Sequence, residues 1–338
     1  MPLRLRHHPL DLRLRHTFRI ARGASDLREN LLVELEHEGG VGLGEAAPIH
    51  RYGEDRASAS AAVEAMAGRL VRPRAFRLAA REAAVEGQRS AEAAVDMALH
   101  DLAGRRLGVP LYELLGLDGS RTPQTSFTIG LDTPEVVARK VKEAAAYPVL
   151  KVKMGSADDR EVLAAVRDST DRPIRVDANE GWTPAEALER LDWLARLRVE
   201  FVEQPLPAGQ LEETRALRRR SPLPFFADES VHRAEDIPRL AGAFDGINIK
   251  LMKCGGLAEA MRMIAVARAH GMQVMLGCMI ESSLAITAAA HLSPLVDTAD
   301  LDGNLLLEDD PFTGATVVDG RIVLPDGPGL GVRRRAGS

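Results

Sequence analysis

The chain has 338 residues and a formal net charge of −5, with 45% hydrophobic and 28% charged residues. This composition is typical of a globular protein with one large domain or two ordinary ones. The acidic balance and the 4% aromatic content give no basis for nucleic acid or an anionic membrane as a partner.

The number of cysteines and the distribution of apolar residues indicate in which cellular compartment the protein is expected. Cys254 and Cys278 are the only two cysteines and form neither a disulfide framework nor a zinc pattern, as expected in a reducing cytosol. The first residues, MPLRLRHHPL, lack the apolar core of a signal peptide, and no stretch reaches transmembrane length. We therefore expect a cytoplasmic protein.

Residues 1–120 predict an α+β unit in which strands precede helices. Leucines on mostly alternating positions between 3 and 14 indicate a half-buried strand. The segment LLVELEHEGGVGLGEA predicts a hairpin that turns at Gly39-Gly40. An Ala-rich helical pattern follows from about 55 to 107, and Ser90 is a candidate N-cap of its last helix.

Residues 121–310 predict a closed parallel (β/α) barrel. Short apolar runs recur about every 25 residues, which is the length of one strand–helix unit. The runs start near Gln124, Val149, Ile174, Phe201, Phe225, Gly246, Gln273 and Thr298. Eight strands at this spacing favour a barrel of the TIM type, whose active site lies at the carboxyl ends of the strands.

The tail, residues 311–338, predicts a hairpin that turns at Asp319-Gly320. The eight barrel strands are already assigned, so we expect this tail to pack back on the N-terminal unit and to complete a capping domain.

Three of the apolar runs end on a carboxylate. Asp177, Glu203 and Asp228 lie one strand–helix unit apart. A buried charge is costly unless it is paired or coordinated, and three oxygen ligands favour Mg²⁺, with Mn²⁺ as the alternative. Each carboxylate alone fits a helix cap or a loop ion pair, but three in register predict a metal site. Asn179 and Glu229 are expected as outer partners of the ligands.

Two further runs end on lysine. Lys151 and Lys153 point to the same face of one strand, since strand side chains alternate. Lys250 ends a strand across the barrel mouth, so Lys153 and Lys250 are placed to approach a substrate carbon from opposite sides. A lysine beside a cation and another ammonium has a lowered pKa and can act as a base. Lys253 competes with Lys250 for this role and otherwise fits a solvated or phosphate-binding lysine.

The last apolar run leads into DLDGN, in which Asp300 and Asp302 share one face, away from the three carboxylates. The pair suits a substrate ammonium group. From the residues alone, two loop-capping aspartates are the slightly favoured interpretation.

These residues together resemble the enolase superfamily, in the subgroup similar to muconate-lactonizing enzyme. The segments KVKMG, DAN, EQP, ADES and NIKLMKCGG stand in the family order, and the resemblance spans nearly the whole chain. It implies an α+β capping domain, a (β/α)7β barrel and a tail that rejoins the cap. It also implies Lys153 and Lys250 as the acid/base pair, and Mg²⁺ bound by Asp177, Glu203 and Asp228.

Within that subgroup the chain is similar to the dipeptide epimerases, of which the L-Ala-D/L-Glu epimerases are the best-known example. DLDGN matches their D-x-D, which implies that Asp300 and Asp302 hold the free ammonium of a dipeptide. TSFTIG and GCMIESS match their first and seventh barrel strands. The resemblance therefore implies substrate contacts at Thr128, Lys151, Met279 and Glu281.

One segment departs from the pattern of the group. In the Ala-Glu enzymes a basic residue of the first capping loop meets the side-chain carboxylate of the substrate. Here that loop reads FRIARGAS, and either Arg19 or Arg22 is expected to take the part.

The implied reaction is a 1,1-proton transfer at the α-carbon of the C-terminal residue of a dipeptide, through an enediolate that Mg²⁺ stabilises. Cap loops near Arg22 and Tyr52 are expected to exclude water. Alternatives in the same superfamily are o-succinylbenzoate synthesis, N-acylamino acid racemisation and cycloisomerisation, whose substrates have no ammonium to hold. A Schiff-base aldolase barrel needs no three-carboxylate site, and a non-catalytic barrel has little use for five matched ionisable residues. Barrels of this kind commonly assemble, so we expect a homo-oligomer.

Overall fold

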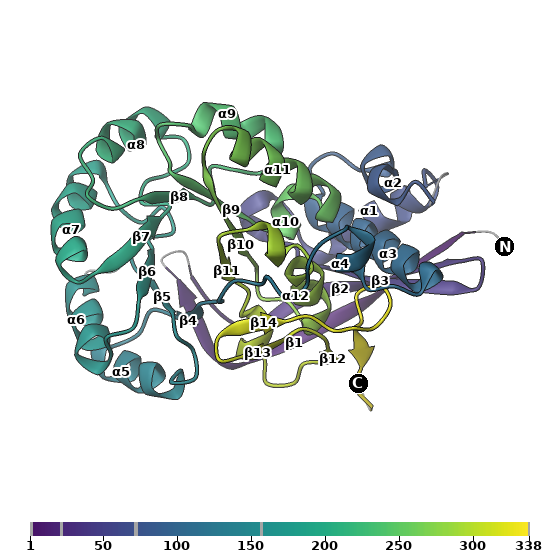
Figure 1. The fold of residues 1–338 in the computed structure, drawn as a ribbon, viewed down its shortest axis with the longest axis horizontal. Coiled ribbons are helices and arrows are strands. Elements are labelled where there is room, and N and C mark those ends of the chain that lie inside the picture. Colours follow the sequence, from purple (N-terminus) through teal and green to yellow (C-terminus); the bar gives the residue numbers. More distant parts are fainter. Residues whose placement is uncertain (1–2, 21–22, 71–73, 156–157, 337–338) are drawn as a thin grey trace.

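Eight short parallel strands, one from each predicted run, form the barrel (Figure 1). The structure is a computed structural model that describes residues 3–20, 23–70, 74–155 and 158–336. The barrel strands are β4 (Phe127–Ile129), β5 (Leu150–Lys153), β6 (Ile174–Asp177), β7 (Val199–Glu203), β8 (Phe225–Ala227), β9 (Gly246–Ile249), β10 (Gln273–Gly277) and β11 (Thr298–Asp300). They lie side by side in chain order, and a parallel bridge between Thr125 and Ala299 closes the sheet on itself. The predicted barrel is confirmed.

Every barrel strand except the last is followed by a helix on the outer surface (Figure 1). These helices are α5 (Pro134–Glu143), α6 (Asp159–Ser169), α7 (Pro184–Arg196), α8 (Leu211–Arg218), α9 (Ile237–Leu240), α10 (Leu251–Cys254) with α11 (Leu257–Ala269), and α12 (Ser283–Ala290). After β11 the only helical element of the described chain is the short 3-10 turn η4 (Gly303–Leu306), which gives the (β/α)7β pattern. Within the described ranges, no helix combines the length and the apolar character that a membrane crossing requires.

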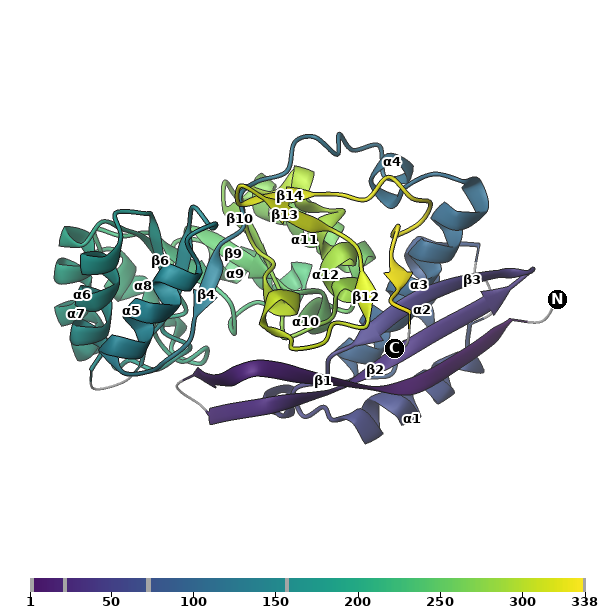
Figure 2. The same ribbon diagram turned by 90° about the horizontal axis from the view of Figure 1, so that it is seen from below.

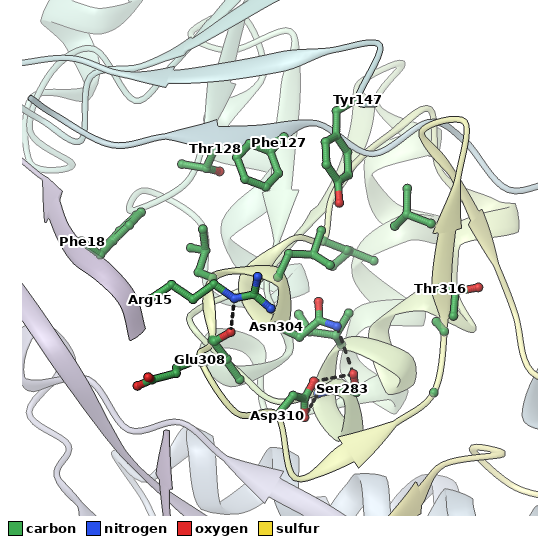
Figure 3. A pocket seen from close by; sticks show the side chains of 18 of the residues that line it. Arg15, Phe18, Phe127, Thr128, Tyr147, Ser283, Asn304, Glu308, Asp310 and Thr316 are labelled. Carbon is green, nitrogen blue, oxygen red and sulfur yellow. Dashed lines mark hydrogen bonds between the residues drawn. The ribbon is translucent and has the colours of Figure 1, made fainter. Parts of the chain in front are cut away.

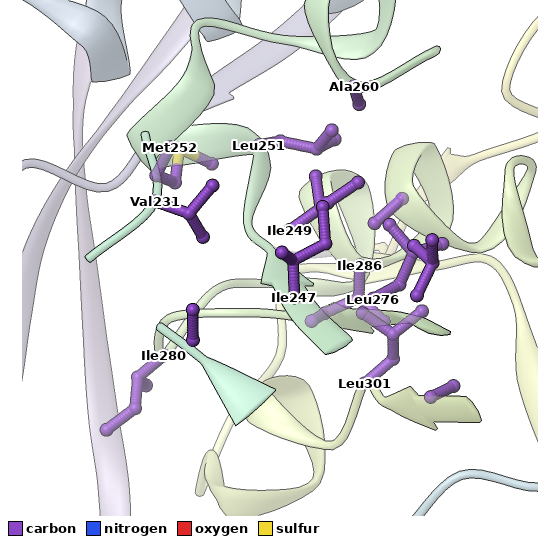
Figure 4. Close-up of a cluster of buried hydrophobic side chains, with 14 of the residues drawn as sticks. Val231, Ile247, Ile249, Leu251, Met252, Ala260, Leu276, Ile280, Ile286 and Leu301 are labelled. Carbon is purple, nitrogen blue, oxygen red and sulfur yellow. The ribbon is translucent and has the colours of Figure 1, made fainter. Parts of the chain in front are cut away.

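Side chains of the strands alternate between two cores. Outward-facing side chains pack against the helices, and Figure 4 labels Ile247, Ile249, Leu276, Ile286 and Leu301 of this cluster. Phe201, Phe226 and Met275 point inward and form a separate cluster. Because the side-chain period is two, the next inward position along β7 and β8 holds Glu203 and Asp228. Inward positions in the middle of the barrel are therefore apolar, and those at its carboxyl end are ionisable.

The cap is an antiparallel sheet backed by helices, and Figure 2 shows its long strands running along one side of the molecule. The sheet contains β1 (Arg4–Ile20), β2 (Gly23–His37) and β3 (Gly40–Ala46), and the helices are α1 (Arg56–Ala67), α2 (Phe76–Ala83), α3 (Arg89–Leu107) and α4 (Leu111–Leu114). Helix α3 lies directly on β3. A Cβ at Gly44 would stand 1.9 Å from Ala94 O, so any side chain there would push the helix off the sheet.

Two local predictions in the cap are wrong. The hairpin turns at Glu38-Gly39, whose φ angles are +50° and +82°, so β3 starts one residue earlier than expected. Ser90 is not the N-cap of α3, because Gln88 holds that position. Instead the carboxylate of Glu54 accepts two backbone N–H groups at the start of the helix, at 2.8 and 3.0 Å, and also the Ser90 hydroxyl. A residue distant in sequence has taken over the capping role.

The tail divides its contacts between barrel and cap. Strands β13 (Thr316–Val318) and β14 (Arg321–Val323) form the predicted hairpin, which lies against the barrel, since Thr125 N donates to Gly320 O at 2.9 Å. The segment that follows the hairpin reaches the cap, where Leu330 N donates to Asp101 at 2.8 Å. A last short pair joins β12 (Phe312–Thr313) to β15 (Arg333–Arg334). The end of the tail thus contacts the cap, and the hairpin contacts the barrel.

Candidate active site

Three carboxylates meet at the carboxyl end of the barrel. Asp177 and Glu203 end the neighbouring strands β6 and β7 in register, and Asp228 directly follows β8. All three are buried, and each offers an oxygen within 4.8 Å of the others. A cluster of three buried carboxylate oxygens suits a hard divalent cation such as Mg²⁺. The three residues predicted from the sequence are therefore brought together in space.

An amide that the sequence analysis missed holds one of these carboxylates. Asn248 Nδ2 donates to Glu203 Oε1 at 2.7 Å. A Cβ at Gly277 would lie 2.5 Å from Asn248 Oδ1, so only glycine leaves the amide its place. Asn248 stands two residues before Lys250, and strand alternation alone would have put both on the inward face.

The two expected outer partners lie at the same site. Asn179 N donates to Asp177 Oδ1 at 2.9 Å, and Asn179 Nδ2 lies 3.5 Å from Glu229 Oε1. Gln204, which was not predicted, accepts the backbone N–H of Asp228 at 3.0 Å. These contacts orient the loops that carry the carboxylates.

Two lysines approach the carboxylates from opposite sides of the barrel. Lys153 Nζ, on β5, lies 2.6 Å from Asp177 Oδ2, and Lys250 Nζ, after β9, lies 2.8 Å from Asp228 Oδ2. β5 and β9 are four strands apart in the eight-stranded order, which places them across the barrel. Both lysines line the same cavity, so a substrate between them would have an ammonium group on each face.

Lys253, the competitor of Lys250, is held inside the protein. Its Nζ donates to Asp228 Oδ1 and to Asp228 O, both at 2.5 Å, and to Val231 O at 3.2 Å. It is 2% exposed and is not among the residues that line the cavity. Its hydrogen-bond donors are used to position the Asp228 loop, so the geometry favours Lys250 as the group that faces a substrate.

Lys151 joins the metal carboxylates to the last strand. Its Nζ lies 2.7 Å from Asp300 Oδ2, 2.8 Å from Glu203 Oε2 and 3.1 Å from Asp177 Oδ2. The residue is 1% exposed. Three carboxylates around one ammonium offset the cost of burying each charge.

Neighbouring carboxylates decide the direction in which the pKa of Lys250 is shifted. Burial alone would lower the pKa of Lys250, but Asp228 and Glu203 outweigh it and raise that pKa. Burial would raise the pKa of Asp228, but Lys250 and Lys253 hold it well below its usual value. The direction for Lys250 is opposite to the lowered pKa expected from the sequence. A divalent cation shared by the same carboxylates would weaken their pull on the lysine.

Asp300 and Asp302 form a second acidic site in the cavity. Asp300 accepts Ser126 Oγ at 2.6 Å in addition to Lys151, whereas Asp302 accepts the backbone N–H of Thr128 at 2.6 Å. Among the described residues no cationic side chain pairs with Asp302. Burial and the neighbouring Asp300 raise the pKa of Asp302. An incoming cation would relieve this repulsion, which is the property expected of an ammonium site.

A cavity of about 440 Å³ lies between the barrel mouth and the cap. The predicted residues that line it are Thr128, Lys151, Lys153, Asn179, Asp228, Glu229, Lys250, Met279, Asp300 and Asp302. From the cap come Phe18, Arg28, Arg51 and Tyr52. Arg51 also donates to Glu180 of a barrel loop at 2.5 Å, which ties the cap to the rim of the site.

Two of the described residues expected at the substrate, Glu281 and Arg19, do not line this cavity. Glu281 lies one layer behind it, where its carboxylate accepts Met279 N at 2.8 Å, and burial with Glu45 nearby raises its pKa to about 8. The Arg19 side chain is exposed and does not line the cavity, and Arg22 lies outside the described residues.

Arg28 is the cap arginine that the sequence analysis missed. It lies on β2 and lines the cavity. Burial lowers its pKa, and its Nε has no hydrogen-bond partner among the described residues. The residue pattern of a cap strand does not show which of its arginines faces the barrel, because the barrel residues lie far away in the sequence.

A (β/α)7β barrel with a capping domain, a three-carboxylate cluster and opposed lysines defines a class of metal-assisted acid/base enzymes. A family model described as Enolase C-terminal domain-like matches residues 135–336, and one described as Mandelate racemase / muconate lactonizing enzyme, N-terminal domain, matches residues 7–116. The chain belongs to this mandelate racemase and muconate lactonizing enzyme family of the enolase superfamily.

Several proteins similar to this chain over nearly its whole length are named dipeptide epimerases. The L-Ala-D/L-Glu epimerase of Bacteroides thetaiotaomicron is 44% identical over 98% of this chain and 88% of its own length. A dipeptide epimerase from Enterococcus faecalis V583, solved with Mg and L-Leu-L-Tyr, has a TM-score of 0.92 and 33% identity, covering 98% of this chain and 99% of that one. An N-succinyl Arg/Lys racemase from Bacillus cereus has a TM-score of 0.93 and 28% identity, covering 99% and 96%. Fold likeness alone therefore does not separate the two activities.

Proposed function

We propose that this protein is a Mg²⁺-dependent dipeptide epimerase, an isomerase that inverts the α-carbon of the C-terminal residue of a dipeptide. The observation that carries the proposal is one cavity that holds three kinds of group. Its lining contains Asp228 of the carboxylate cluster, with Asp177 and Glu203 directly behind it, two lysines on opposite sides, and the aspartate pair Asp300 and Asp302. The dipeptide epimerase relatives support the same conclusion.

Asp300 and Asp302 would bind the free ammonium of the dipeptide and so place its C-terminal residue between Lys153 and Lys250. One lysine removes the α-proton from one face, and the other, as an ammonium, delivers a proton to the opposite face. Mg²⁺ held by Asp177, Glu203 and Asp228 would neutralise the charge that develops on the substrate carboxylate.

The aspartate pair favours a dipeptide over an N-acylated amino acid. An acylated nitrogen carries no charge, so it would leave Asp302 buried beside Asp300 without a cation, and this burial is unfavourable. A free ammonium converts the same pair into a charge-assisted hydrogen-bond site. The same argument disfavours o-succinylbenzoate synthesis and cycloisomerisation.

Arg28 supports an acidic side chain at the second position of the dipeptide. It is a partly buried guanidinium in the cap wall of the cavity, and no carboxylate of the described residues forms an ion pair with it. A substrate carboxylate would supply the missing anion. We therefore assign to Arg28 the contact that was expected of Arg19 or Arg22.

The test is proton NMR in D₂O with Mg²⁺ and L-Ala-L-Glu, compared with N-acetyl-L-Ala-L-Glu. The proposal expects loss of the glutamate α-proton signal, formation of the L,D epimer, and little exchange in the acetylated compound. Equal exchange in both compounds, or exchange confined to N-succinyl amino acids, would refute it. Replacing Arg28 by Met should lower kcat/KM for L-Ala-L-Glu and leave kcat/KM for L-Ala-L-Leu unchanged.

We also propose that the protein acts in the cytoplasm as a homo-oligomer. The two free cysteines support the first point, and the common assembly of such barrels supports the second. Multi-angle light scattering tests the assembly state, and a monomeric mass would contradict it.

A further inference from the structure

A second cavity of about 680 Å³ lies behind the wall of the proposed substrate cavity. It occupies the outer side of β4 and β11, between α5 and α12, where the barrel has no eighth helix. Figure 3 shows Phe127 and Tyr147 on one side of this space and Ser283, Asn304 and Asp310 on the other. The hairpin β13–β14 borders it without filling it.

The two cavities share a thin wall. Phe18, Thr128 and Leu306 line both of them. Thr128 is also the residue whose backbone N–H donates to Asp302 at 2.6 Å. Leu306 ends the turn η4, which begins directly after Asp302. The wall therefore stands next to the carboxylate that is proposed to hold the substrate ammonium.

The side chain of the N-terminal residue of a dipeptide starts one atom away from that ammonium. If the ammonium lies against Asp302, the side chain must lie near the residues that flank Asp302. Of the three wall residues, only Phe18 and Leu306 have large apolar side chains, and both are partly buried against the hydrophobic core. The second cavity offers space for a longer side chain directly behind them.

The far side of the wall suits apolar groups. Phe127 and Tyr147 stack with their ring centres 4.7 Å apart, and Leu301, Leu305 and Ile286 complete that side of the second cavity. An apolar side chain that entered this space would exchange water for hydrocarbon contacts, which is favourable.

From these contacts we propose that Leu306 and Phe18 set the upper size limit for the first residue of the substrate, with the second cavity as the space that this wall closes off. The inference rests on the proposed function and names the substrate class that follows from it: dipeptides with a small N-terminal residue. Removing the Leu306 side chain joins the two cavities and shifts the preference toward large apolar N-terminal residues.

The test compares kcat/KM for L-Ala-L-Glu and L-Phe-L-Glu in the full-length protein and its variants. Leu306→Ala should shift the ratio toward L-Phe-L-Glu by about tenfold or more, the usual range for methylene groups in an apolar pocket. Leu305→Ala is the matched control, because Leu305 is the neighbouring leucine and lines only the second cavity. It should leave the ratio unchanged. Thr316→Trp, added to Leu306→Ala, should fill the second cavity from its exposed far side and reverse the shift.

Phe18→Ala provides an independent variant from a different segment of the wall, should Leu306→Ala fail to fold. The inference is overturned if Leu305→Ala shifts the ratio as much as Leu306→Ala. It is also overturned if Leu306→Ala and Phe18→Ala lower kcat/KM for L-Ala-L-Glu and for L-Phe-L-Glu by the same factor. An unmodified protein that does not epimerise L-Ala-L-Glu would refute the proposed function instead, so the two failures are distinct.

Discussion

Asn248 donates its side-chain amide to Glu203 Oε1 at 2.7 Å from the strand next but one. The contact orients a metal-site carboxylate that, among the described residues, forms an ion pair with Lys151 as its only lysine. We expect Asn248→Leu to lower the affinity for Mg²⁺ by about 10- to 100-fold, the usual effect of removing a partner of a metal ligand. Titration calorimetry with Mg²⁺ checks this. Thr298→Val, another polar-to-apolar change on a barrel strand, should not lower the affinity, and equal losses in both variants would contradict the assignment.

Each lysine is expected to serve one face of the substrate. Lys153→Ala and Lys250→Ala should each abolish net epimerisation, with kcat reduced by at least about 10²- to 10⁴-fold because a general acid or base is lost. Each variant should still exchange the α-proton of one epimer with D₂O, and the two variants should exchange opposite epimers. NMR of the separate L,L and L,D dipeptides reads this out. Exchange of the same epimer by both variants would rule out opposed faces.

The role of Asp302 can be separated from general acidity. Asp302→Asn removes one charge from the proposed ammonium site, so KM for L-Ala-L-Glu should rise by about 10- to 100-fold, because charge-assisted hydrogen bonds contribute about 1.5–3 kcal/mol. Asp309→Asn makes the same charge change at an exposed position seven residues further along the chain and should leave KM unchanged. Steady-state kinetics at saturating Mg²⁺ decide between these results.

The stability of the protein should fall in mild acid because of His291. This buried ring accepts the backbone N–H of Tyr112 through Nδ1 at 3.2 Å and therefore donates through Nε2 to Leu330 O at 3.1 Å. Burial lowers the pKa of His291 from 6.5 to about 4. The unfolded chain thus binds more protons between these values, so stability is full above pH 6.5 and is lost as the pH falls toward 4.

Urea unfolding at pH 7.5 and pH 4.5 measures this loss. His291→Gln removes the titrating group, so the acid-induced fall in the free energy of unfolding should be smaller by about 2–3 kcal/mol than in the unmodified protein, as one pKa unit corresponds to about 1.4 kcal/mol. His16→Gln, at an exposed position, is the control and should show the same fall as the unmodified protein. An unchanged fall in His291→Gln would contradict the linkage.

The barrel was predictable because its signal is local and repeated. Each strand is a short apolar run, six of the eight lead to a charged inward residue, and the spacing of about 25 residues fits one strand–helix unit. Asp177, Glu203 and Asp228 could be grouped from this spacing, since parallel strands end at the same edge. The ammonium-binding role of Asp300 and Asp302 was instead inferred from the family resemblance, because two aspartates after a strand also fit a capped loop.

What the sequence by itself determined is the order of the strands, the charged residues at the ends of most of them, and with these the chemistry of the carboxyl end of the barrel. The tertiary structure alone decided which groups face one another across it. It buried Lys253 under the Asp228 loop and left Lys250 in the cavity, and it placed Arg28 of the cap in the cavity wall. The physical reason is that periodicity fixes which face of its own element a side chain occupies. A contact between cap and barrel depends on how two separately folded surfaces dock, and no local pattern in either one records this.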